Sequence, residues 1–428
     1  MPLTILKDAD VSRILHSLTR DDVLKLQSTF ADALHWYSTS KDANDCCSDF
    51  QPERTVLKRK DGSTSLFMPA SGTSGQGVKV VNVAAPSGSS NKSSQLSSQP
   101  GQSEGNTEVS VENLNPAQPP LKADSTIKGS ITLLDQAGNT TGLLNAEEVT
   151  AFRTALASSL LLAKRENVHT LTVFGGGKQA YWHIRLALLL KGPAIQNMNI
   201  VTRNPDTARA CLLRLQNPQP DDPGFANHAT HDKLRRNVLT PRHGDYDRIL
   251  QNYIRDADVI FGTTPSTTPH FPASHLLDPE GKAKSRYIAL VGSYKPHMVE
   301  LDPEIFKDAV SARSEQRAPN RRQKVVVDTA AGCMKEAGEI IQAGLTGEQV
   351  VQLGELFMLK ERAEKRYRED GAQLKGGGDE EGKGLSDWLV KGDVLFKCVG
   401  IGLMDMVVGA ELVDLARQRK IGVTVDDF

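Results

Sequence analysis

The chain has 428 residues, of which 39% are hydrophobic and 24% charged, with a formal net charge of −1, and these values predict a water-soluble globular protein of two or three domains. The near-neutral charge balance excludes a broadly basic nucleic-acid binder, and no apolar run approaches the roughly 18 residues that a membrane helix needs. The N-terminus is charged where a signal peptide would be apolar, and the five cysteines form no CxxC pair, so we expect a cytoplasmic protein without a disulfide framework or a metal site.

The first part of the chain is expected to contain helices followed by strands. Apolar residues at helical spacing predict helices between residues 8 and 37. Strand-like patterns lie within 55–83 and at 130–134, and a long helix is expected over 145–164. The segment 87–120 is rich in serine and proline and almost free of apolar residues, so we predict a disordered insertion there.

The middle of the chain alternates between short apolar strands and helices. The predicted strands are 170–174, 197–202, 259–262, 287–291 and 325–327, and helices follow the first two at 179–190 and 206–215. Short buried strands separated by helical segments are typical of parallel sheets. The alternation therefore predicts an α/β fold with a Rossmann-type, doubly wound parallel sheet.

A glycine-rich turn, residues 175–180, joins the first of these strands to its helix. Gly175 suits a tight turn, Gly177 lets the backbone approach a pyrophosphate, and Ala180 keeps the helix close to the strand. The helix N-terminus, which carries Lys178 and Gln179, offers amide donors and a positive dipole end. The turn predicts dinucleotide binding, and the alternative is a glycine turn in an α/β domain that binds no cofactor.

The end of the second strand indicates which cofactor binds. An NAD-selective site usually places Asp or Glu there, but residues 175–205 include no acid and Arg203 closes the strand. A guanidinium suits a 2′-phosphate, so NADP(H) is preferred, with NAD(H) as the second choice; the alternative for Arg203 is a solvated residue at a helix entry. Thr263 and Thr264 follow a later strand, at the carboxyl edge where open α/β sheets bind ligands.

Several further motifs occur in a fixed order along the chain. They are QPERT at 51–55, FMPA at 67–70, GVKVV at 77–81, FRTALA at 152–157, a GxGxQAxxH fingerprint at 175–183, ADVI at 257–260, VGSY at 291–294, ELD at 300–302 and FKCVG at 396–400. Together they resemble the ornithine cyclodeaminase and mu-crystallin family, over nearly the whole chain apart from the insertions.

The resemblance implies a two-domain protomer that typically forms a homodimer. A Rossmann NAD(P)-binding domain is expected at 151–324, and an α+β substrate-binding and dimerisation domain is expected from 1–150 together with 325–428. Family members bind NAD or NADP(H) with a small amino or imino acid. Val291 and Gly292, in the VGSY motif, are added to the expected cofactor-binding residues.

The resemblance also assigns candidate catalytic residues. Arg54 and Arg153 match the family's substrate-carboxylate arginines, and Lys79 matches its active-site lysine. Their chemistry agrees, because arginines bind carboxylates bidentately and a lysine beside arginines has reason for a lowered pKa. The alternatives are surface ion pairs and a strand lysine whose amine reaches solvent. Tyr294 is also a candidate and departs from the family, since ornithine cyclodeaminases carry there an aspartate that contacts the substrate's side-chain amine.

Three functions follow from these residues. The leading one is an NAD(P)H-dependent reductase of cyclic or N-substituted 2-imino acids, of the ketimine or pyrroline-2-carboxylate type, because neutral Tyr294 suits a substrate without a terminal ammonium. The first alternative is ornithine cyclodeaminase, which converts L-ornithine to L-proline and ammonia with NAD recycled in place. The second alternative is a non-catalytic, NADPH-dependent protein that binds a small ligand.

Overall fold

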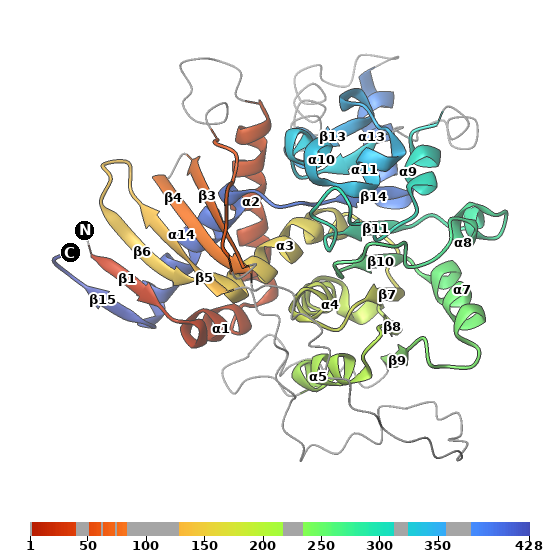
Figure 1. Ribbon diagram of the computed structural model, residues 1–428, viewed down its shortest axis with the longest axis horizontal. Coiled ribbons are helices and arrows are strands. Elements are labelled where there is room, and N and C mark those ends of the chain that lie inside the picture. The colour runs from red at the N-terminus through yellow and green to blue at the C-terminus, as the bar shows by residue number, and fades with distance from the viewer. Residues whose placement is uncertain are drawn as a thin grey trace.

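The computed structural model describes residues 2–39, 51–60, 63–72, 75–83, 128–216, 234–311, 324–356 and 378–428. These residues form two sheets and the helices that pack on them (Figure 1). The insertion predicted at 87–120 lies outside the described residues. None of the described helices combines the length and apolar character that crossing a membrane requires.

The smaller sheet has seven strands in the order β15-β1-β6-β5-β4-β3-β2. Its strands are β1 (Leu3–Leu6), β2 (Thr55–Lys58), β3 (Thr64–Gly72), β4 (Gly75–Val83), β5 (Lys128–Leu134), β6 (Thr140–Asn145) and β15 (Val423–Val425). The strands from β2 to β6 form an antiparallel meander, and β1 adds in parallel to β6. Both chain ends therefore pair in one sheet, as Figure 1 shows.

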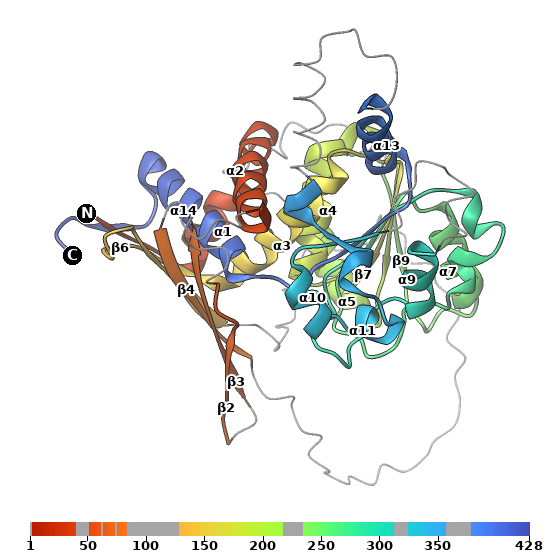
Figure 2. The same cartoon turned by 90° about the horizontal axis from the view of Figure 1, so that it is seen from above.

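Helices pack on one face of the smaller sheet. They are α1 (Asp8–His16), α2 (Arg20–Thr39), α3 (Ala146–Leu162) and α14 (Gly402–Arg419). In Figure 2, α2 and α14 stand on the same side of β3 and β4. On β4, Gly77, Lys79 and Val81 alternate as buried residues, so Lys79 lies on this helix-covered face.

The larger sheet has eight strands in the order β13-β12-β14-β11-β10-β7-β8-β9, and all its pairings are parallel. The strands are β7 (Thr170–Phe174), β8 (Asn197–Val201), β9 (Arg235–Leu239), β10 (Val259–Gly262), β11 (Tyr287–Leu290), β12 (Val325–Val327), β13 (Val350–Gln352) and β14 (Val394–Lys397). Around it lie α4 (Lys178–Lys191), α5 (Pro205–Gln216), α7 (Tyr246–Asp256), α8 (Ser274–Leu277), α9 (Pro303–Ala309), α10 (Ala330–Glu336), α11 (Gly338–Ala343) and α13 (Gly378–Lys391). The predicted α/β fold with a doubly wound parallel sheet and a second domain is confirmed.

The expected division of the chain at residue 324 is wrong for three strands. β12, β13 and β14 pair within the larger sheet, and the chain returns to the smaller sheet only at α14. A short apolar run fits either sheet equally well, so its local pattern does not reveal which sheet it joins. Helix α3 is buried along nearly its whole length, because it contacts β5 of the smaller sheet as well as α4.

Candidate active site

The fingerprint turn between β7 and α4 has the geometry of a phosphate-binding turn. Gly175 has φ of +112°, and a Cβ there would lie 2.7 Å from Oγ1 of Thr263. At Gly177, by contrast, a Cβ would meet no atom within 4 Å, so this backbone faces open space. Gly177 also caps α4 without a side-chain hydrogen bond, which leaves the amides of its first turn to a ligand. These residues therefore fit a dinucleotide pyrophosphate.

The neighbouring fingerprint residues differ in their surroundings. The ammonium of Lys178 pairs with Glu147 and lies 3.4 Å from Oε1 of Glu148, both in the first turn of α3. The buried Oε1 of Gln179 has no hydrogen-bond partner among the described residues. Ala180 is fully buried, as expected for close packing of α4 on the sheet.

Together with the fingerprint turn after β7, the other expected cofactor contacts follow four neighbouring strands along the carboxyl edge of the larger sheet. Arg203 is exposed after β8, and the hydroxyl of Thr263, after β10, donates to the carbonyl of Phe174 at the end of β7. After β11, a Cβ at Gly292 would lie 2.2 Å from the carbonyl oxygen of Thr264. Val291 precedes it and is half-buried. The loops therefore meet where the strand order reverses, the place where such sheets bind ligands.

Lys79, Arg153 and an aspartate from the last helix form a buried ion cluster. Nζ of Lys79 on β4 lies 2.9 Å from Oδ1 of Asp405, and Nε of Arg153 on α3 lies 3.2 Å from the same oxygen. Asp405 belongs to the first turn of α14 and is fully buried. Three elements thus bring together side chains that are remote in sequence. The other oxygen of Asp405 has no hydrogen-bond partner within the described part of the chain.

The cluster changes the proton affinity of its lysine. Burial lowers the pKa of Lys79 to about 8; the Asp405 carboxylate acts to raise it, and the charges of Arg153 and Arg54 lower it further. At this value Lys79 holds or releases a proton near neutral pH, as a general acid or base requires.

Arg54 and Arg153 both reach Gly400, which lies between β14 and α14. The Arg54 guanidinium donates to the Gly400 carbonyl at 3.2 Å and pairs with Glu336 at 2.8 Å. Gly400 has φ of +86°, and a Cβ there would lie 2.6 Å from the NH1 nitrogen of Arg153. Only glycine therefore fits between the two arginines at this turn.

Asp328 holds this turn at the edge of the larger sheet. It follows β12, and its carboxylate accepts the backbone N–H groups of Gly400 at 2.6 Å and Val399 at 3.2 Å. The thiol of Cys398 donates to the same carboxylate. Because Val399 and Gly400 continue from β14, the arginines lie beside the carboxyl edge that carries the loops expected to bind a cofactor.

Tyr294 lies in the loop after β11, close enough to Arg54 for the charge of this arginine to affect the pKa of the phenol. Burial raises the pKa of its phenol, and Arg54 opposes that rise. The phenol is therefore neutral at pH 7, as expected from the sequence.

Sequence reasoning missed Asp405 and Asp328. The signals were present, because Asp405 interrupts an apolar helix and Asp328 directly follows the three valines of β12. Buried acids of this kind are found where a charge needs a partner. Within the described ranges, no group of three His, Cys, Asp or Glu side chains is arranged to hold a metal ion.

Comparisons with known proteins give relatives but no matching family model. The chain is 27% identical over 250 residues to the uncharacterized protein YGL159W of Saccharomyces cerevisiae, and 30% identical over 184 residues to an uncharacterized cyclodeaminase of Dictyostelium discoideum. These matches span 54% and 41% of this chain, and 64% and 48% of the two relatives. A Delta(1)-pyrroline-2-carboxylate reductase of Bacillus cereus is 23% identical over 88% of this chain and 91% of its own length.

Solved structures agree in fold. An archaeal alanine dehydrogenase dimer with bound NAD has a TM-score of 0.62 at 17% identity and covers all of both chains. The Delta(1)-pyrroline-2-carboxylate reductase of Thermococcus litoralis, in complex with NADH and L-proline, has a TM-score of 0.59 at 17% identity over 99% of this chain and 100% of the other.

The relatives and the order of the sequence motifs agree. The chain is similar to cyclodeaminases and pyrroline-2-carboxylate reductases, which supports the resemblance to the ornithine cyclodeaminase and mu-crystallin family. The relatives named by activity are reductases and cyclodeaminases.

Proposed function

We propose that this chain is an NAD(P)H-dependent reductase of cyclic or N-substituted 2-imino acids. The observation that carries the proposal is the convergence of Arg54, Lys79 and Arg153 at the turn before α14, beside the cofactor edge of the larger sheet. Two of these three cations are guanidinium groups, although the carboxylates of Asp405, Glu336 and Asp328 lie beside them. Guanidinium groups suit a substrate carboxylate, because they bind it bidentately.

The role proposed for Lys79 is to give a proton to the imine nitrogen. Its pKa of about 8 leaves most molecules protonated at neutral pH, and Asp405 holds the ammonium in place. Arg54 and Arg153 would clamp the carboxylate, so that the C=N carbon is held in one orientation. A bound nicotinamide cofactor would supply the hydride.

NADP(H) is the proposed cofactor, ahead of NAD(H). Arg203 is exposed at the end of β8, and no acidic side chain occurs between residues 175 and 205 to repel a 2′-phosphate. The structural relatives named above hold NAD or NADH, so the preference rests on this chain's own residues.

The alternative of ornithine cyclisation is disfavoured by Tyr294. A terminal ammonium buried beside Arg54 would need a carboxylate, whereas this phenol is neutral. The pyrroline-2-carboxylate reductases among the relatives support imine reduction. The third reading, a non-catalytic binding protein, is disfavoured because Lys79 keeps both a lowered pKa and its partner.

The test is oxidation of NADPH with a panel of cyclic and acyclic 2-imino acids, beside an ammonia assay with L-ornithine alone. We expect turnover of a cyclic imino acid and no ammonia. Ammonia with proline from ornithine would establish the cyclodeaminase reading, and binding without any turnover would establish the third.

A homodimer is the proposed assembly, formed through the face of the smaller sheet opposite α14. The strand register brings a row of apolar side chains onto that face: Ile5, Phe67, Val78, Val80, Leu143, Val423 and Val425. Phe67, Leu143 and Val423 are large hydrophobic residues that are 36%, 37% and 59% exposed. An exposed apolar patch of this kind is typical of a protein–protein interface. Leu143→Lys should turn a dimer into a monomer in light scattering. A cytoplasmic location is part of the proposal and is supported by the cysteine pattern.

A further inference from the structure

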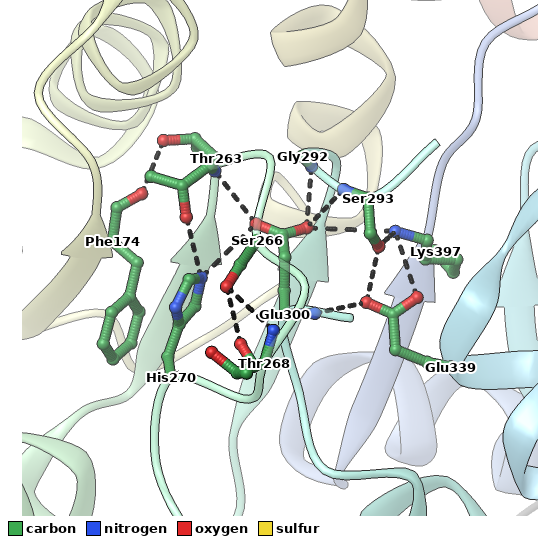
Figure 3. Close-up of polar contacts among 11 residues, drawn as sticks. Phe174, Thr263, Ser266, Thr268, His270, Gly292, Ser293, Glu300, Glu339 and Lys397 are labelled. Atoms are coloured by element: carbon green, nitrogen blue, oxygen red, sulfur yellow. Dashed lines mark hydrogen bonds and ion pairs between the residues drawn. The ribbon is translucent and has the colours of Figure 1, made fainter. Parts of the chain in front are cut away.

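A buried carboxylate, that of Glu300, joins the ends of two neighbouring strands of the larger sheet (Figure 3). Its Oε1 accepts the backbone N–H of Thr264, after β10, at 3.0 Å. Its Oε2 accepts the N–H groups of Gly292 at 2.7 Å and Ser293 at 3.1 Å, after β11. Gly262 leaves room for it, because a Cβ there would lie 2.8 Å from Oε1. One side chain therefore fixes both loops.

Two further buried charged residues, Lys397 and Glu339, contact Glu300. Nζ of Lys397, at the end of β14, lies 3.8 Å from Oε2 of Glu300 and 3.5 Å from Oε2 of Glu339 on α11. The other oxygen of Glu339 accepts the N–H of Glu300 at 2.8 Å and the hydroxyl of Ser293, to which Lys397 also donates. All three charged side chains are fully buried. Two carboxylates and one ammonium leave a formal charge of −1.

His270 completes the surroundings of Glu300. Its Nε2 lies 2.8 Å from Oγ1 of Thr264 and 3.7 Å from Oε1 of Glu300, and its ring stacks on Phe174 with a centroid distance of 4.6 Å. Burial acts to raise the pKa of Glu300, but His270, Lys397 and the N–H of Thr264 outweigh it and lower the pKa below its usual range. Glu300 is therefore a charged carboxylate at neutral pH.

The backbone that Glu300 holds presents its acceptors to the opposite side. Because N–H and C=O of a trans peptide point in opposite directions, the carbonyls of Thr263, Val291 and Gly292 face away from Glu300. The carbonyl oxygen of Thr263 lies 3.6 Å from where a Cβ of Gly175 would be, so it faces the fingerprint turn. A carboxylate bound to the N–H groups polarises these peptides and makes their carbonyls more negative.

We propose that Glu300 is a positioning residue for the nicotinamide half of the cofactor, and that its charge makes this site favour the oxidised, positively charged ring over the reduced one. The inference rests on the proposed function, because it takes the loops after β10 and β11 as the cofactor loops. Glu300 would then also stabilise the positive charge that develops as a nicotinamide ring gives up hydride.

The experiment measures dissociation constants of NADP⁺ and NADPH, without imino acid, for the full chain and its variants. Glu300→Gln should raise the dissociation constant of NADP⁺ by about tenfold and that of NADPH by about threefold or less, because only the oxidised ring is charged. Glu300→Asp keeps the charge but is too short to span both loops, so both constants should rise by the same factor. Asp302→Asn is the matched control: it removes a charge two residues away, at the N-cap of α9, and should change neither constant.

Glu339→Gln serves where Glu300→Gln does not fold. It removes one charge from the same cluster and leaves in place the three hydrogen bonds that the Glu300 carboxylate accepts from backbone N–H groups. The ratio of the dissociation constants of NADP⁺ and NADPH should therefore shift in the same direction. An unchanged ratio in the variant that folds would overturn the inference and leave Glu300 as a structural support alone. Failure of the unmutated protein to bind either nucleotide would instead refute the proposed function.

Discussion

Nζ of Lys79 lies 2.9 Å from Oδ1 of Asp405, although the two residues are 326 positions apart in the chain. The pair joins the inner face of β4 to the first turn of α14, and Arg153 shares the same carboxylate oxygen. A lysine held between a carboxylate and arginines has its pKa set by their balance, and this balance can be changed one partner at a time.

The pH dependence of imine reduction should reveal Lys79. If its ammonium gives the proton, kcat/KM should fall as pH rises through about 8. Asp405 raises the pKa of Lys79 and Arg153 lowers it. The fall of kcat/KM at basic pH should therefore move to lower pH in Asp405→Asn and to higher pH in Arg153→Ala. If kcat/KM fell at the same pH in both variants, a group other than Lys79 would be responsible for the pH dependence. Asp405→Asn should also lower Tm, since an uncompensated buried charge costs about 3–5 kcal/mol.

Arg153→Ala should weaken use of the imino acid while leaving the cofactor site intact. A charge-assisted hydrogen bond contributes about 1.5–3 kcal/mol, so kcat/KM should fall by roughly tenfold to a hundredfold. The dissociation constant of NADPH should stay within about twofold, because Arg153 contacts Asp405 and the Gly400 turn and not the fingerprint loop. An equal loss of cofactor affinity would place Arg153 in a structural role instead.

Gly177→Ala should separate cofactor binding from folding. The added methyl meets no protein atom within 4 Å, so Tm without cofactor should be unchanged, yet it occupies the space proposed for the pyrophosphate. We expect the dissociation constant of NADPH to rise by about tenfold or more, or about 1.4 kcal/mol. Gly347→Ala is a control in equally open surroundings and should change neither quantity. Unaltered affinity in Gly177→Ala would mean that the pyrophosphate binds elsewhere.

Much of the fold was predictable because its signals are local. The strand, turn and helix at β7 and α4 lie within about twenty residues, and the structure has them as the sequence predicts. The short apolar sequences of β12, β13 and β14 do not predict which sheet these strands join, since strand pairing is a long-range property. Lys178 was expected to bind the cofactor, and it pairs with two acidic residues of α3. No sequence pattern predicts that these acids lie close to Lys178.

The candidate site was predictable only in part, for the same reason. Arg153 and Lys79 were found through motifs, but Asp405 binds them across more than 250 positions of sequence. Glu300 likewise lies within a recognised motif, yet its role follows only from the loops that β10 and β11 bring to it. Buried ion clusters form where distant elements meet, so local patterns reveal their members without revealing their partners.

Arg203→Ala tests the cofactor preference. NADPH should bind the unmutated protein more tightly than NADH at a fixed ionic strength, and the variant should lose most of that difference, about tenfold, because one guanidinium–phosphate contact is removed. Affinity for NADH should change little, since that cofactor has no 2′-phosphate. Equal affinities for the two cofactors in the unmutated protein would contradict the preference.

Tyr294 decides between the two enzymatic readings. Its neutral phenol beside Arg54 gives no partner to a terminal ammonium, and the loss of such a partner costs about 3–5 kcal/mol, or several hundred-fold or more in rate if it falls on the transition state. The unmutated protein should therefore reduce a cyclic imino acid and release no measurable ammonia from L-ornithine. Tyr294→Phe keeps the ring without the hydroxyl and should retain imine reduction within about threefold, because no charge is lost. Tyr294→Asp introduces a carboxylate, which should favour a substrate with a terminal ammonium and lower the rate with the cyclic imine. Ammonia and proline from L-ornithine with the unmutated protein, measured beside the NADPH assay, would restore the cyclodeaminase reading.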